Sequence, residues 1–219
     1  MERADYGIVV VDDQPMCTQA LQWLIKRSVG LSSLGVAHDG DEGCRLVLET
    51  RPDMAVLGTE LPGRGAFEIA EEIESRLQRT RILFLASYVC DALLERAMRV
   101  GARGYLLRTE SMESVIDAIR NVGAGGQGFS DEARDRLTFD PVSREFTLPE
   151  TSELGSLSNR QLEILCQLAI GRTVKEIART MHVSDKAIDS QKYRIMSRLG
   201  IHDRVELARY AIREGLTLP

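Results

Sequence analysis

Two adjacent carboxylates, Asp12 and Asp13, directly follow a continuous apolar run at residues 6–11. Carboxylate oxygens at the end of a buried strand are ligands for a hard cation such as Mg²⁺, and a carboxylate can also act as a nucleophile. Two acids alone supply too few oxygens for a cation that prefers about six, so Mg²⁺ binding at this pair is expected to be weak. The sequence shows neither a nucleophile–base pair nor a cluster with metal-ligand spacing. We therefore predict neither an enzyme nor a resident cofactor or metal.

A second group of polar residues lies on one face of a helix predicted for residues 184–199. Ile188, Ile195 and Leu199 form its apolar stripe, and Ser184 is placed to cap its first turn. A shorter helical pattern at 174–181 and a tight turn at 181–184 precede it, which is the order of elements in a helix-turn-helix. The polar face and its edges hold the residues predicted to contact double-stranded DNA: Lys186, Asp189, Ser190, Lys192, Tyr193 and Arg194.

The charge of the chain is divided unevenly along its length. The 219 residues carry a net charge of −5, yet the residues from 156 onward hold 11 Lys and Arg against 7 Asp and Glu, a net charge of +4. The preceding residues hold 17 and 26, a net charge of −9. Because the local field governs attraction to phosphates, the positive part is the predicted DNA-binding part.

Nothing in the sequence indicates a membrane or an oxidising compartment. No apolar run approaches the roughly 20 residues that cross a bilayer, and the first residues lack the apolar segment of a signal peptide. The four cysteines are widely separated, which is typical of reduced thiols. A cytoplasmic protein without membrane attachment is expected.

Apolar runs and helical patterns alternate through the first 125 residues. Strands are predicted at 6–11, 34–37, 54–57, 82–85 and 105–107, each followed by a helix. This alternation predicts a doubly wound, flavodoxin-like parallel sheet of five strands, with functional residues at the carboxyl ends of the strands. The predicted domains are an α/β domain at 1–125, a linker at 126–155 with a short helix starting near Ser130, and an all-α helix-turn-helix domain at 156–219.

Several motifs from about residue 156 onward resemble the C-terminal domain of LuxR-type regulators of the FixJ/NarL class. They are LSNRQ at 157–161, KEIA at 175–178, VSDKAI at 183–188 and IMSRLG at 195–200. The resemblance implies a transcription regulator that forms a homodimer through its last helix, with Val205, Ala208 and Ile212 at the interface. Asp189 departs from the family, which commonly carries a basic residue there. An aspartate is repelled by phosphates but can accept a hydrogen bond from cytosine N4.

Residues 5–125 resemble the receiver domain of response regulators, through Asp12-Asp13, LPG at 61–63 and GARGYLL at 101–107. The resemblance implies an aspartate that accepts a phosphoryl group after the third strand, a hydroxyl residue after the fourth and a lysine after the fifth. The acids Asp12 and Asp13 would help to hold Mg²⁺ beside them.

This chain departs from the receiver pattern at all three of those positions. Gly58 stands at the acceptor position and has no side chain to phosphorylate. Ala86 stands at the hydroxyl position, with Ser87 next to it, and Arg108 replaces the lysine. A planar guanidinium is not equivalent to a compact ammonium. Asp12 and Asp13 are expected to pair with Arg108 rather than with a metal.

The prediction is an atypical, degenerate-receiver response regulator that acts without aspartyl phosphorylation. The replacing signal is left open between expression level, a protein partner on the face around Tyr105, and a small ligand in the altered pocket. One alternative is a conventional phosphorylation-switched regulator that uses Thr59 or Glu60, although Pro62 predicts a turn that directs residue 60 away. Another is an interaction protein that sequesters a related regulator, suggested by Asp189.

Overall fold

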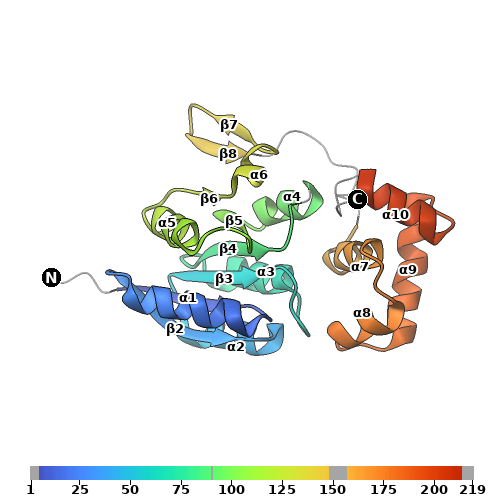
Figure 1. The fold of residues 1–219 in the computed structure, drawn as a ribbon, viewed down its shortest axis with the longest axis horizontal. Coiled ribbons are helices and arrows are strands. Elements are labelled where there is room, and N and C mark those ends of the chain that lie inside the picture. Colours follow the sequence, from blue (N-terminus) through green and yellow to red (C-terminus); the bar gives the residue numbers. More distant parts are fainter. Residues whose placement is uncertain (1–4, 90, 148–156, 214–219) are drawn as a thin grey trace. The chain divides into compact units, whose positions relative to one another are not determined.

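The computed structural model describes residues 5–89, 91–147 and 157–213, together with the side chains of most of them. The described chain forms two compact units, one built on a parallel sheet and one built only of helices (Figure 1). Each is considered by itself. No helix in the described ranges is long and apolar enough to cross a membrane.

The first unit is built on six parallel strands in the order β2-β1-β3-β4-β5-β6. The strands are β1 (Tyr6–Val11), β2 (Leu31–Ala37), β3 (Met54–Gly58), β4 (Arg81–Ala86), β5 (Gly104–Leu107) and β6 (Gly128–Phe129). The connecting helices are α1 (Pro15–Arg27), α2 (Gly40–Thr50), α3 (Ala66–Arg76), α4 (Asp91–Arg99) and α5 (Met112–Gly123). The predicted parallel α/β fold is confirmed, with one strand more than the five expected.

Alternation along the strands divides the core between the two faces of the sheet. Ile8, Val10, Val56 and Leu106 belong to the cluster that packs against α1 and α5. Intervening residues such as Val9 are equally buried on the opposite face. Strands covered on both faces read as unbroken apolar runs, which is why the sequence identified the central strands.

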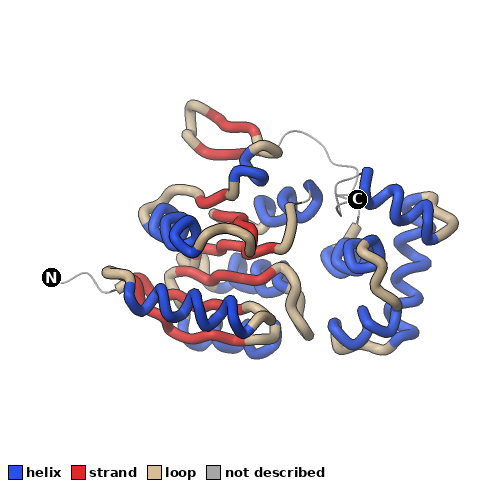
Figure 2. The backbone as a smooth tube through the Cα atoms, in the orientation of Figure 1, coloured by secondary structure: helices blue, strands red, loops and turns tan. Residues whose placement is uncertain are grey.

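Residues 126–147 correct the predicted linker, because they are folded. After β6, the short helix α6 (Asp131–Arg134) starts at Ser130, whose Oγ accepts from the Ala133 amide at 3.2 Å. Strands β7 (Thr138–Asp140) and β8 (Glu145–Thr147) then form an antiparallel hairpin, labelled beside α6 in Figure 1 and drawn as red tube segments in Figure 2. The predicted short helix is confirmed and the predicted linker is wrong as far as residue 147. The rest of that linker, residues 148–155, lies outside the described residues.

The hairpin is fastened to the edge of the sheet by a small set of contacts around Phe146. The Phe146 amide donates to Gln127 Oε1 at 2.7 Å, and Gln127 Nε2 donates back to the Phe146 carbonyl at 3.3 Å. The Phe146 ring lies 5.9 Å from that of Phe129. Arg103 Nη1 donates to Glu145 Oε1 at 2.6 Å. These contacts join the hairpin to β6 and to the start of β5.

The second unit consists of α7 (Asn159–Ala169), α8 (Val174–Thr180), α9 (Asp185–Leu199) and α10 (Arg204–Arg213). Ser158 and Thr173 each complete a capping box with the residue three positions on, so two orphan donors are satisfied at each helix start. Ser184 caps α9, and Gly200 ends it in the left-handed conformation, with φ 66°. The helix-turn-helix pair predicted from the sequence is therefore α8 and α9.

Phe146→Ala should release the hairpin while leaving the sheet intact, because it removes the ring contacts with Phe129 and Phe139. Amide hydrogen exchange in β7 and β8 is expected to accelerate, with little change in β1 and β3. Val142→Ala is the matched control, since Val142 is 91% exposed in the same hairpin. Equal exchange in the two variants would show that Phe146 does not fasten it.

Candidate functional site

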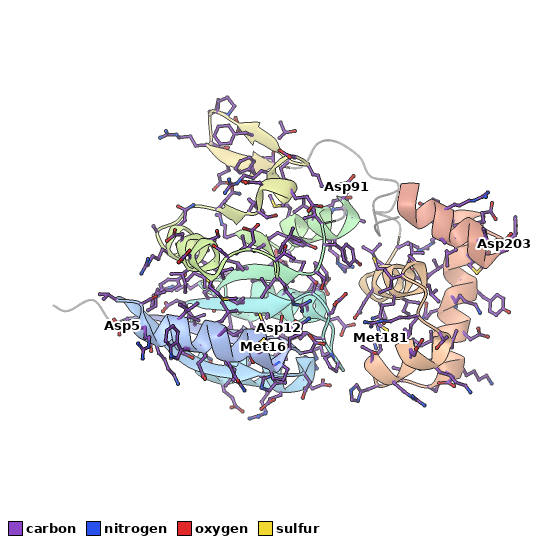
Figure 3. The ribbon with its side chains drawn as sticks, in the orientation of Figure 1. Asp5, Asp12, Met16, Asp91, Met181 and Asp203 are labelled. Carbon is purple, nitrogen blue, oxygen red and sulfur yellow. The ribbon has the colours of Figure 1, made fainter. Side chains whose placement is uncertain are left out.

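The carboxyl ends of four strands gather the residues singled out in the first half of the sequence. Asp12, Gly58 and Arg108 each stand two positions beyond a residue of the α1/α5 core, namely Val10, Val56 and Leu106. Since side chains alternate along a strand, the three positions continue that same face of the sheet. Figure 3 labels Asp12 at this edge, near the start of α1. The sequence placed these residues correctly at one edge.

The Arg108 guanidinium is the centre of the pocket and is only 9% exposed. Its Nη2 and Nε atoms donate to Asp12 Oδ2 at 2.9 and 3.1 Å. Its Nη1 donates to Ser87 Oγ at 2.7 Å and lies 3.4 Å from Glu60 Oε2. Asp13 Oδ1 is 3.6 Å from Nη2. One guanidinium thus serves three carboxylates and one hydroxyl, and the predicted pairing of Arg108 with Asp12 and Asp13 is present.

Asp12 is held on its other side as well. Its side chain is 1% exposed, and its Oδ1 accepts from the Gln14 amide at 2.9 Å. A carboxylate buried to this degree needs a charged partner and hydrogen bonds to remain ionised. Arg108 and the Gln14 amide supply both, so the geometry explains how an acid is kept at this strand end.

Mutual electrostatics perturbs the pKa values around this pocket. Burial lowers the pKa of Arg108, but the charges of Asp12, Glu60 and Asp13 outweigh it and leave the pKa raised. Burial raises the pKa of Asp13, with Arg108 opposing and the neighbouring acids adding to the rise. Burial, followed by the charge of Asp12, raises the pKa of the Cys17 thiol to about 11. Cys17 is therefore a neutral thiol near pH 7.

Gly58 leaves no room for the missing aspartate in the present arrangement. A Cβ atom at this position would lie 2.5 Å from Asp12 Oδ2 and 2.9 Å from Arg108 Nη2. The ends of two flexible side chains would have to move before any side chain fitted there. The guanidinium and the glycine thus fit each other, and the space next to Gly58 is filled by the Asp12–Arg108 pair.

Two positions of the pocket differ from the simplest reading of the sequence. Ala86 is buried at the end of β4, and the hydroxyl comes from Ser87, one residue later. Glu60, which Pro62 was expected to direct away, joins the pocket, and its Oε2 also accepts from Ser87 Oγ at 3.3 Å. Its position two residues beyond Gly58 was the available signal, but the turn that Pro62 predicts argued against it.

The residues present do not fit the Mg²⁺ ion that receiver domains use. The third carboxylate at the end of β3 is missing, and a cationic guanidinium lies among the carboxylates that remain. Within the described ranges, no group of three or more His, Cys, Asp or Glu side chains is arranged to hold a metal ion.

In the second unit, α9 presents a polar face next to the α8–α9 turn. Lys186, Ser190, Tyr193 and Arg194 are exposed, whereas Ile195 is buried on the opposite side. Tyr193 is 63% exposed. This division agrees with the predicted apolar stripe and places four of the six proposed DNA contacts on the accessible surface.

Asp189 and Lys192 are half-buried and paired with each other. Lys192 Nζ lies 2.6 Å from Asp189 Oδ1. Lys192 Nζ also lies 4.8 Å from the centre of the Tyr193 ring. The acid that looked unfavourable on a DNA-facing helix is thus locally neutralised. Lys192 was predicted as a phosphate contact, but in the free protein its charge is directed to Asp189.

The three residues expected at a dimer interface have different surroundings. Val205 is 64% exposed on α10, and Ala208 is half-buried. The side chain of Ile212 lies outside the described residues. An exposed valine on a surface helix is compatible with a contact surface but does not by itself define one.

Arg108→Met should lower the free energy of unfolding by about 3–5 kcal/mol near neutral pH, because the buried Asp12 loses its partner. Burial already raises the pKa of Asp13, and without the opposing charge of Arg108 that pKa should rise further above its value in the unfolded chain. The folded variant binds more protons, so its stability falls as pH rises through that range. The deficit is therefore expected to be smaller at about pH 5 than at about pH 8. Urea unfolding followed by circular dichroism measures the free energy of unfolding of both proteins at each pH.

The matched control for this substitution is Arg45→Met. Arg45 pairs with Glu49 on the surface, with side chains 63% and 59% exposed, so its loss should cost less than about 1 kcal/mol. Millimolar Mg²⁺ should stabilise Arg108→Met and leave the native chain unchanged. A cost in Arg108→Met no larger than in Arg45→Met would contradict the central role of the guanidinium.

Comparison with known families and structures agrees with both units. The family described as response regulator receiver domain matches residues 8–120, and bacterial regulatory proteins, luxR family, matches residues 155–211. Transcriptional regulatory protein LiaR of Bacillus subtilis (strain 168) is 30% identical over 210 residues, covering 95% of this chain and 98% of LiaR. Response regulator UvrY of Escherichia coli (strain K12) is 28% identical over 96% of this chain and 95% of UvrY.

Among solved structures, RcsB from Salmonella enterica serovar Typhimurium bound to promoter rprA superposes with a TM-score of 0.62, covering 94% of this chain and 98% of that one. At 17% identity this likeness concerns the fold alone. The two family matches and the similarity to LiaR show the family as well as the fold. The chain belongs to the LuxR family of bacterial regulatory proteins and is a DNA-binding transcriptional response regulator with an N-terminal receiver domain.

Proposed function

We propose that this regulator binds specific DNA sites as a homodimer and that its receiver domain is controlled without aspartyl phosphorylation. The observation that supports the second part best is the Arg108 guanidinium beside Gly58, within hydrogen-bond distance of Asp12 Oδ2. A receiver needs a carboxylate nucleophile and a metal that neutralises the incoming phosphate. Here the carboxylate nucleophile is missing, and the positive charge next to Gly58 is that of a guanidinium held by Asp12.

Arg108 gives this pocket a permanent electrostatic state. In a phosphorylated receiver the charge at the strand ends changes with each phosphoryl transfer, whereas a guanidinium keeps its charge throughout the accessible pH range. Its bonds to Asp12 and Ser87 tie the ends of β1, β4 and β5 together. The receiver is therefore expected to stay in one state until a different signal acts. That signal is a protein partner, a small ligand or the level of expression. Tyr105, which was expected on the partner face, is fully buried, so its side chain is not available to a partner.

Glu60 keeps a second candidate function open, a regulator switched by phosphorylation at a substitute acceptor. Its carboxylate reaches the pocket and is 30% exposed. Against this, its Oε2 faces both Ser87 Oγ and Arg108 Nη1, at 3.3 and 3.4 Å. A carboxylate held by donors is a weaker nucleophile. The guanidinium also lies among the three acids Asp12, Asp13 and Glu60, which in the described part of the chain are not arranged as a metal site. Phosphorylation at Glu60 is the less favoured reading.

Incubation with acetyl phosphate and Mg²⁺ should leave the native chain unmodified, as followed by intact-mass spectrometry. Gly58→Asp alone should also react poorly, because its new side chain meets Asp12 and Arg108. The triple substitution Gly58→Asp, Ala86→Ser, Arg108→Lys restores all three positions and should gain one phosphoryl group. Asp53→Asn is the control, because Asp53 accepts from the Gly7 amide at the opposite end of the sheet. This substitution should not change whether a phosphoryl group is gained.

Two outcomes would contradict the proposal. A phosphoryl group on the native chain, mapped to Glu60 and abolished by Glu60→Gln, would favour the substitute acceptor. Phosphorylation-dependent dimerisation in Gly58→Asp alone would show that Arg108 and Ala86 do not prevent the switch.

For DNA, the proposed reading surface is the exposed face of α9. Arg194 and Lys186 are placed to hold phosphates, contacts that position a protein without reading sequence. Ser190, Tyr193 and Asp189 are placed for base edges, and Asp189 would accept from a cytosine N4 amino group. The pairing of Asp189 with Lys192 supports this role, because the lysine offsets the repulsion between an aspartate and the phosphates.

Homodimerisation through α10 would present two copies of α9 to a repeated site, which compensates for few contacts per monomer. A protein that sequesters a related regulator remains the contrasting function, since it would use the same helix without binding DNA. The two are separated by whether the purified chain binds a duplex with the salt dependence of counterion release.

Arg194→Ala should weaken binding to all duplexes and reduce the slope of log K against log salt by about one. Asp189→Ala should instead relax base preference, costing roughly 1–3 kcal/mol at the cytosine-bearing position only. Fluorescence anisotropy at several salt concentrations, on a site found by selection from a random duplex library, distinguishes them. Arg45→Ala, on the surface of the receiver, is the control. Firm heterodimer formation with no salt-dependent duplex binding would favour the sequestering function.

A further inference from the structure

A small cavity lies in the second unit, on the side of α9 that adjoins α7 and α10. It has a volume of about 310 Å³, which is at the lower end of the range for sites that hold small organic ligands. Leu168 and Leu207 are buried at its base, and Val174 and Met196 are half-buried in its walls. The base and walls are therefore apolar.

The rim of the cavity is polar and carries two fixed cations. Arg172 and Lys192 both line it, together with the exposed Asp203. Asp203 adds one negative charge, and its Oδ1 accepts from the Glu206 amide at 2.8 Å. Against the two cations, the lining therefore keeps a net positive charge. Arg172 is held in place by Gln167, with Nη1 donating to Oε1 at 3.1 Å. An apolar base under two rim cations is complementary to an aromatic body that bears one anionic group.

The cavity shares residues with the proposed DNA-reading surface. Lys192 and Tyr193 line the cavity and also belong to the polar face of α9. Lys192 Nζ lies 2.6 Å from Asp189 Oδ1 and over the Tyr193 ring. An anion in the cavity would compete with Asp189 for this ammonium. Asp189 would then face the DNA without its neutralising partner, and duplex binding would weaken.

We infer that this cavity is an effector site for a small aromatic carboxylate or sulfonate, and that its occupation weakens DNA binding through Lys192. The inference adds a regulatory input to the helical unit, separate from the receiver pocket. Its DNA-coupled part rests on the proposed function, whereas ligand binding itself does not. The coupling is expected to be at least about fivefold in the Kd for DNA, the lower end of typical allosteric couplings.

The test uses the full chain and the fluorescent probe 1-anilinonaphthalene-8-sulfonate. The probe should bind saturably, with one site per chain, and N-phenyl-1-naphthylamine, which has the same rings without the sulfonate, should bind about tenfold more weakly. Met196→Trp and Val174→Phe each fill the cavity and should abolish saturable binding. Ile170→Phe is the matched control, because Ile170 is 44% exposed and does not line the cavity.

Using two cavity-filling variants guards against a failure to fold, which circular dichroism detects. The DNA measurement then follows on the native chain and on Met196→Trp, with and without saturating probe. A probe-dependent rise in the Kd for DNA in the native chain only is the expected result. Probe binding that persists in both cavity variants, equal binding of the uncharged analogue, or an unchanged Kd for DNA would each overturn the effector site. Absence of duplex binding by the native chain without probe would count against the proposed function instead, and the probe titrations would still decide whether the cavity binds a ligand.

Discussion

A carboxylate buried at the end of a parallel strand has to be neutralised, and in this protein one guanidinium does so. Asp12 is almost completely covered, and Arg108 reaches it from β5 with two nitrogen atoms. The same group meets Glu60 and Ser87, so the ends of neighbouring strands are joined by charge-assisted hydrogen bonds. Removing any one member of this cluster leaves a buried charge or hydrogen-bonding group without its partner. That constraint explains why Gly58 and Arg108 occur together, since the guanidinium uses the space that an aspartate would need.

In the helix-turn-helix unit, too, an acidic side chain is paired with a nearby cation. Asp189 brings a negative charge onto the proposed DNA-reading face of α9, and Lys192 offsets it from one helical turn away. In both units an unusual residue is accompanied by a nearby partner of opposite charge. The difference lies in burial: the Asp12–Arg108 pair is sealed from solvent, whereas the pair on α9 is accessible and open to exchange with an incoming anion.

The sequence was most informative where burial is complete and least informative where contacts are made by loops. The central strands and the edge that carries Asp12 and Arg108 followed from unbroken apolar runs and from period-two alternation. Glu60 was misjudged, because alternation says nothing about a side chain that reaches back from a turn. The β7–β8 hairpin has strands of three residues each, too short for any periodicity to show. Its stability depends on partners distant in sequence, such as Gln127 and Arg103.

That hairpin also determines where the chain can be divided. Because Arg103 binds Glu145 of β8 and β5 pairs with β6, the structural boundary of the first unit falls after Thr147 rather than at the end of α5. A chimeric regulator joined at residue 125 would separate β6 and the hairpin from β5 and Arg103, which hold them. A junction after Thr147 keeps the hairpin with the strand edge and the arginine that hold it. Exchange of sensory or DNA-reading modules between relatives is therefore best made there.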